Sequence, residues 1–85
     1  MVTDKIQPDD WIRLGNRDAV VCNVYENRPG FIEVVYLDRE RAINEDAHWI
    51  DDHWEFVHQG SSGGYADKYD RLSRFVSILR AGRYH

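Results

Sequence analysis

Residues 11–57 consist of short runs of β-branched and aromatic side chains, and turn-forming residues separate each run from the next. The runs are predicted to be strands at Trp11–Leu14, Ala19–Tyr25, Phe31–Leu37, Ala42–Ile50 and His53–Val57. Gly15, Pro29-Gly30 and Asp51-Asp52 lie between runs and favour tight reversals of the chain. Short strands joined by such turns predict an antiparallel meander that curls into a barrel or a strongly bent sheet.

Apolar and polar residues alternate within several of these runs, so each strand is expected to bury one face. Val20, Cys22 and Val24 are predicted to share a face of the second strand, as are Trp54 and Phe56 in the last strand. Cys22 is the only cysteine and lies in an apolar run, so we interpret it as a small buried hydrophobic residue.

A helical pattern covers residues 65–82. At 100° per residue, five apolar side chains fall within a stripe about 80° wide; they are Tyr65, Tyr69, Leu72, Val76 and Leu79. The same spacing predicts ion pairs between Asp67 and Arg71 and between Asp70 and Arg74. Gly82, which follows the last apolar position, is expected to end the helix.

The order of these elements looks like a small SH3-like barrel with a helical appendage. We therefore expect an α+β fold, a five-stranded antiparallel SH3-like barrel or curled sheet followed by one C-terminal amphipathic helix. Eighty-five residues suit a single domain, residues 1–85. Within it we expect a strand-rich barrel at 10–58, a Gly/Ser linker at 59–64 and the helix at 65–82.

The stretch RAINEDAHW at residues 41–49, together with WEF at 54–56, resembles uncharacterised small bacterial proteins that are often carried on mobile (integron) gene cassettes. The resemblance covers residues 10–58. It implies a compact barrel and no defined activity, so no functional residues can be transferred from it.

The charge is unevenly distributed. Residues 1–58 contain six basic and thirteen acidic side chains, whereas residues 59–85 contain five basic and two acidic ones. An acidic body makes nucleic acid an unlikely partner, because neutralising phosphates supplies most of the affinity for it. The basic helix could contact nucleic acid weakly or lie against the acidic body. The chain shows neither an export signal nor a long apolar run, so we expect a cytoplasmic protein without membrane contact.

The segment 46–58 is acidic, aromatic and rich in histidine. A hairpin could bring His48, Asp51 and His53 together around a metal ion, but their spacing matches no metal motif. A polar turn with solvated histidines is the preferred interpretation, and no metal or cofactor is expected. Binding of a small molecule or metal ion by this hairpin is kept as the alternative function.

No catalytic motif is evident. The serines available as nucleophiles are Ser61, Ser62, Ser73 and Ser77, two in the linker and two on the polar face of the helix. Neither position resembles the strained turn that presents a nucleophilic serine. We therefore expect a non-enzymatic protein.

One helical residue lies outside the core stripe. Ile78 is about 140° from Tyr65, beside Phe75 and flanked by two arginines. It is either a single exposed aliphatic residue or part of an apolar edge that packs on a twin helix or another protein. Trp11 and Phe31 lie opposite the aliphatic faces of their strands, so they are either covered by the helix or form a groove. The candidate interaction surface comprises Arg71, Arg74, Phe75, Ile78, Trp11 and Phe31. The expected function is a protein-interaction module that self-associates through its helix.

Overall fold

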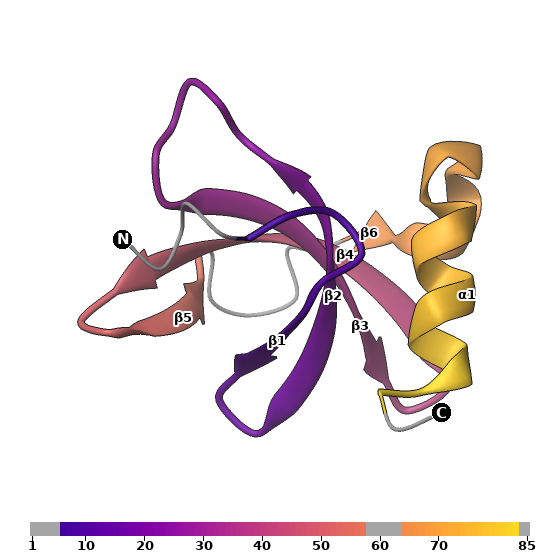
Figure 1. Ribbon diagram of the computed structural model, residues 1–85. Coiled ribbons are helices and arrows are strands. Elements are labelled where there is room, and N and C mark those ends of the chain that lie inside the picture. The colour runs from indigo at the N-terminus through magenta and orange to yellow at the C-terminus, as the bar shows by residue number, and fades with distance from the viewer. Residues whose placement is uncertain (1–5, 58–63, 84–85) are drawn as a thin grey trace.

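The computed structural model describes residues 6–57 and 64–83 (Figure 1). The barrel strands are β1 (Trp11–Leu14), β2 (Arg17–Val24), β3 (Phe31–Asp38), β4 (Arg41–Ile50) and β5 (His53–Phe56). After them come a short strand, two 3₁₀ turns and a helix: β6 (Gly64–Tyr65), η2 (Ala66–Lys68), η3 (Asp70–Leu72) and α1 (Ser73–Ala81). The predicted α+β fold, a five-stranded barrel followed by one C-terminal helix, is confirmed.

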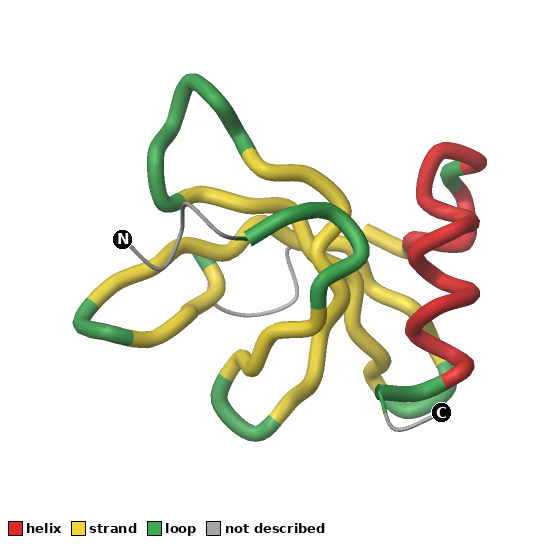
Figure 2. Tube along the Cα trace, in the orientation of Figure 1, coloured by secondary structure: helices red, strands yellow, loops and turns green. Residues whose placement is uncertain are grey.

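The barrel is closed by a parallel contact, so it is mixed rather than wholly antiparallel. Each strand from β1 to β5 pairs antiparallel with the next, and β1 then pairs with β5 through Leu14 and Trp54 alone. An odd number of strands that alternate in direction leaves the first and last strands parallel. The parallel closure therefore follows from the strand count, and Figure 2 shows the hairpins that extend from the barrel.

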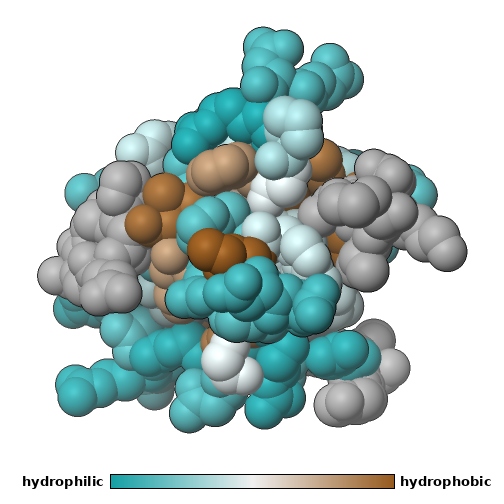
Figure 3. All heavy atoms as spheres, turned by 90° about the vertical axis from the view of Figure 1, so that its left-hand side faces the viewer, coloured by the Kyte–Doolittle hydropathy of each residue, from teal (hydrophilic) through white to brown (hydrophobic). Residues whose placement is uncertain are grey.

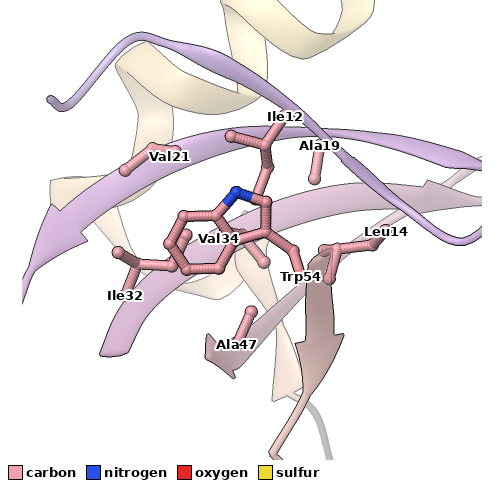
Figure 4. Packing of buried hydrophobic residues seen from close by; sticks show 8 residues of the cluster. All are labelled: Ile12, Leu14, Ala19, Val21, Ile32, Val34, Ala47 and Trp54. Atoms are coloured by element: carbon pink, nitrogen blue, oxygen red, sulfur yellow. The ribbon is translucent and has the colours of Figure 1, made fainter. Parts of the chain in front are cut away.

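The barrel interior is filled by a first hydrophobic cluster, which is shown in Figure 4. Its buried members are Ile12, Leu14, Ala19, Val21, Ile32, Val34, Ala47 and Trp54. The indole of Trp54 lies in the middle of the group, with the smaller side chains arranged around it. Ile12, Leu14, Ile32, Val34 and Trp54 lie on the strand face expected from the alternation of apolar residues. Ala19 and Val21 instead lie opposite the face predicted for the second strand.

A second hydrophobic cluster lies between the outer face of the barrel and the C-terminal segment, residues 64–83. Its buried members are Val20, Cys22, Val35, Ala42, Ala66, Leu72, Val76 and Leu79. Strands β2 and β3 are therefore covered on both faces, which explains their runs of consecutive apolar residues. In Figure 1, α1 lies along one side of the barrel, away from the hairpin of β4 and β5.

A β-bulge in β2 corrects the predicted strand face. Val21 pairs with Val34 and Asn23 pairs with Glu33, so Cys22 is an extra residue in β2. The extra residue reverses the alternation that follows it. Val24 consequently packs against the interior cluster, whereas Cys22 packs in the second cluster. The prediction that Val24 shares the face of Cys22 is wrong.

The helix begins at Ser73, so the predicted span of 65–82 is wrong at its N-terminal side. Tyr65 is extended because β6 pairs with β4 at Ile43, and Tyr69 is extended between the two 3₁₀ turns. These breaks in the helical path place Ala66 and Leu72, both fully buried, against the sheet. Gly82 ends the helix as predicted, with a φ of 93°.

The face turned away from α1 is mixed in character. Hydrophobic residues reach the surface near the middle of this face, and hydrophilic residues border them (Figure 3). No helix within the two described ranges is long and apolar enough to cross a membrane. Except for Gly64, the predicted linker at 59–64 lies outside the described residues.

Candidate interaction surface

Two exposed tyrosines mark the outer side of the C-terminal segment. In the described part of the chain, the large hydrophobic residues that remain exposed are Ile50 at 40%, Tyr65 at 42% and Tyr69 at 46%. Tyr65 and Tyr69 belong to one short stretch, whereas Ile50 ends β4. A side chain added at Gly64, the residue before Tyr65, would lie 3.9 Å from the Tyr69 hydroxyl, so the Tyr69 side chain reaches back to β6.

Cationic side chains lie over both tyrosine rings. Arg41 donates a hydrogen bond of 2.6 Å from Nη1 to the Tyr65 hydroxyl, and its guanidinium carbon is 5.2 Å from the ring centre. Lys68 Nζ lies 5.6 Å from the same centre, and the Arg71 guanidinium lies 5.7 Å from that of Tyr69. Such contacts contribute about 0.5–1 kcal/mol each at exposed sites, so they hold the rings in place. We call these five residues the tyrosine surface.

Arg71 also anchors this surface to the barrel. Its Nη1 and Nη2 donate hydrogen bonds of 2.9 Å to the two carboxylate oxygens of Glu33 on β3. Glu33 is only 6% exposed, so the pair satisfies a buried charge. The hydrogen bonds from Arg71 lower the pKa of Glu33 against the opposing effect of burial. Arg71 therefore pairs with β3, and the predicted pair with Asp67 is wrong.

Two further arginines of the segment, Arg74 and Arg83, also pair with acidic residues far away in the sequence. Arg74 bonds to Asp9 rather than to the predicted Asp70, and Arg80 approaches Asp67 at 3.5 Å. Arg83 donates a hydrogen bond of 3.1 Å to Asp18 at the start of β2. The positive charge of the C-terminal segment thus meets acidic residues of the barrel, as one of the two interpretations of the charge distribution expected.

The apolar residues of the predicted interaction surface are partly buried. Trp11, Phe75 and Ile78 all pack against the second hydrophobic cluster. Phe75 also has the Arg74 guanidinium 5.7 Å from its ring centre. These three side chains close the edge of the contact between α1 and the barrel. Packing on the second cluster gives these residues a structural role in addition to the predicted interaction.

We expect Ile78→Asp to lower the free energy of unfolding by about 1–3 kcal/mol, because it places a carboxylate against an apolar cluster. Urea unfolding followed by fluorescence measures the change. Ser77→Asp is the matched control, since Ser77 is an exposed neighbour on α1. Equal effects of the two substitutions would contradict the packing of Ile78 against the barrel.

Phe31 of the predicted interaction surface lies on β3, and the two histidines of the predicted metal site lie on β4 and β5. The Phe31 ring packs on His48, with centres 5.3 Å apart, and the Arg28 guanidinium lies 4.1 Å from its centre. His53 Nδ1 is 2.9 Å from the Asp51 carbonyl oxygen, and its Nε2 is 2.8 Å from Glu55. These two hydrogen bonds, first that to the Asp51 backbone, raise the pKa of His53.

Two of the proposed metal ligands are therefore engaged in other contacts. His48 stacks on Phe31 and His53 bonds to its neighbours. Across residues 6–57 and 64–83, no three His, Cys, Asp or Glu side chains converge as metal ligands. The structure thus does not bring His48, Asp51 and His53 together as a metal site.

Comparison with known proteins identifies no relative: no protein-family model, curated protein or solved structure matches the chain. The interpretation of the surface therefore depends on the geometry of this chain.

Of the serines considered as nucleophiles, Ser73 and Ser77 are exposed on α1. Ser61 and Ser62 lie outside the described residues.

Helical periodicity assigns Tyr65 and Tyr69 to the core stripe, so the tyrosine surface could not be predicted from the sequence pattern. One signal was present, since Glu33 is the only charged residue in the run Phe31–Leu37. A carboxylate in such a run requires a cationic partner from another element. The cationic partner of Glu33 is Arg71.

Proposed function

We propose that this protein is a non-enzymatic interaction module that self-associates through its tyrosine surface. The observation that supports the proposal is the exposure of Tyr65 and Tyr69 on one short segment, with cations of that segment and of β4 over their rings. Tyrosine and arginine are enriched where protein contacts supply most of their binding energy. Rings that are already fixed lose little conformational entropy on binding.

A second copy of the chain fits the charges of this surface. Asp67 and Asp70 lie on the same short segment as Lys68 and Arg71, so acids and bases alternate there. In a twofold contact, each residue of one protomer meets a residue of the same patch on its partner. A patch of mixed charge is complementary to itself in that arrangement, whereas a purely basic patch would repel its copy.

The C-terminal segment is still the contact, as the sequence predicts, but its centre lies at Tyr65 and Tyr69 instead of Phe75 and Ile78. Phe75 and Ile78 contribute indirectly, because they pack α1 against the barrel. A cytoplasmic location and kinship with the bacterial mobile-cassette proteins belong to the same proposal. Neither requires an enzymatic activity.

Light scattering after size-exclusion chromatography tests the proposal. We expect the mass to rise with concentration from 10.1 kDa towards twice that value. Tyr69→Ala is expected to weaken association by about tenfold, because truncating a central tyrosine typically removes more than 1 kcal/mol.

Ile50→Ala is the matched control, since Ile50 is similarly exposed but lies on β4 outside the tyrosine surface. At every concentration, Ile50→Ala should have the same mass as the wild-type protein. A wild-type protein that stays monomeric, or an equal effect of both substitutions, would contradict the proposal.

A further inference from the structure

A cavity opens beside the single residue pair that closes the barrel. It has a volume of about 580 Å³ and lies among the β1–β2 turn, the barrel-facing residues of β3 and β4, and β5. Leu14 and Trp54, which form the closing pair, contribute to its wall. A cavity of this size accommodates a small organic molecule.

A buried carboxylate lies in this cavity. Glu45 is 8% exposed and pairs in register with Val34, whose side chain belongs to the interior cluster. Side chains opposite each other in a sheet point to the same face, so Glu45 points towards the barrel interior. Its Oε2 accepts a hydrogen bond of 3.2 Å from the Tyr36 hydroxyl.

The hydroxyl of Tyr36 remains a donor to this carboxylate. Burial, followed by the negative charge of Glu45, raises the pKa of Tyr36 to about 12. The phenol is therefore neutral at physiological pH and contributes no second negative charge to the cavity.

Aromatic rings form the wall next to the carboxylate. The rings of Tyr36 and Phe56 have centres 5.0 Å apart, and both residues line the cavity. The Arg17 guanidinium lies 5.2 Å from the centre of the Tyr36 ring, held by a hydrogen bond of 3.1 Å to the Leu37 carbonyl oxygen. A cation of the chain itself thus already lies over this aromatic ring.

We propose that the cavity binds a small organic cation, with its ammonium group beside the Glu45 carboxylate and next to the rings of Tyr36 and Phe56, where it competes with the Arg17 guanidinium. A buried carboxylate favours a cation and repels an anion. Aromatic faces attract ammonium groups, above all quaternary ones. Leu14 and Trp54 provide apolar wall for the carbon part of the ligand.

The charge of the ligand can be tested with a matched pair of probes. Choline and 3,3-dimethylbutan-1-ol have the same shape and differ in the charged nitrogen. Titration followed by NMR should give choline an affinity at least about tenfold higher than that of the alcohol. Equal binding of both would show an apolar cavity without cation recognition, and binding of neither would also overturn the proposal.

Two substitutions test the residues. Glu45→Gln should lower the affinity for choline by about tenfold or more, because it removes the buried charge. Arg17→Ala should raise it several-fold, because it removes a like charge and clears the face of the Tyr36 ring. Arg17 is exposed, so this variant keeps the fold even if Glu45→Gln does not.

Glu55→Gln is the matched control, since Glu55 lines the same cavity but is exposed at its rim. It should change the affinity for choline far less than Glu45→Gln does. Weaker binding by Arg17→Ala, or an equal loss in both glutamate variants, would contradict the proposed position of the ammonium group.

Discussion

Replacing Trp54 with alanine is expected to lower the free energy of unfolding by about 3–5 kcal/mol. Trp54 is 6% exposed, and its ring packs edge-on against Trp49 with centres 5.2 Å apart. Its backbone also forms the only pairing between β1 and β5 with Leu14. A domain of this size has a total stability of only about 5–10 kcal/mol, so much of the variant should be unfolded at 37 °C.

Thermal unfolding followed by circular dichroism measures this effect. Trp49→Ala is the matched control, because Trp49 is the half-buried member of the same ring pair. It should cost clearly less than Trp54→Ala. A Trp54→Ala variant that melts close to the wild-type temperature would contradict the central position of Trp54 in the barrel.

Arg71→Ala is expected to lower the free energy of unfolding by about 1–3 kcal/mol. The substitution leaves the buried Glu33 carboxylate without its two hydrogen bonds from the guanidinium. The loss is smaller than for a fully buried pair, because the Arg71 side chain is 61% exposed and water screens its charge. Chemical unfolding at pH 7 measures the change.

Two further variants show whether the stability that Arg71 provides comes from its charge or from its paired hydrogen bonds. Arg71→Lys keeps the charge but loses the paired hydrogen bonds, so it should restore only part of the stability. Arg74→Ala removes an exposed ion pair with Asp9 and should cost less than about 1 kcal/mol. Equal losses for Arg71→Ala and Arg74→Ala would contradict the anchoring role of Arg71.

The same pair predicts a pH dependence. Because Arg71 lowers the pKa of Glu33 in the folded state, the stabilisation is fully present above the unfolded pKa of about 4.3. It is lost as the pH falls through the lower, folded pKa, since protonation of Glu33 then weakens the pair. Glu33→Gln should remove this part of the acid dependence. An unchanged slope in Glu33→Gln would contradict the assignment.

The barrel could be predicted because its information is local. Each strand is a short β-branched or aromatic run bounded by turn residues, and strand order follows from the short connections. The bulge at Cys22 could not be predicted, since Val20, Val21 and Cys22 are all apolar and allow either face. The second cluster, which buries the outer face of β2, makes both choices compatible with an apolar residue.

The C-terminal segment was only partly predictable, because tertiary contacts override its periodicity. Tyr65 and Tyr69 match a helical stripe, but pairing of β6 with β4 holds Tyr65 extended. The ion pair between Arg71 and Glu33 joins residues 38 positions apart, which the i,i+4 spacing could not reveal. The location of the tyrosine surface therefore required the structure.

The residues of the candidate cavity could not be predicted from the sequence either. Glu45 and Asp46, in the polar middle of β4, alternate between the two faces of the strand. Glu45 bonds to Tyr36 on the inner face, and Asp46 accepts a hydrogen bond of 2.6 Å from the Tyr25 hydroxyl on the outer face. Tyr36 lies on β3 and Tyr25 directly follows β2, so only the fold identifies these partners.

Amide NMR spectra recorded over a dilution series test the proposed self-association most directly. We predict concentration-dependent shifts from micromolar to millimolar protein that are centred on Arg41 and residues 64–72 and are greatly reduced in Tyr69→Ala. Such a result would place the contact between two copies at the tyrosine surface. Spectra that do not change with concentration, or changes centred on Ile50 and the β4–β5 hairpin, would contradict this account.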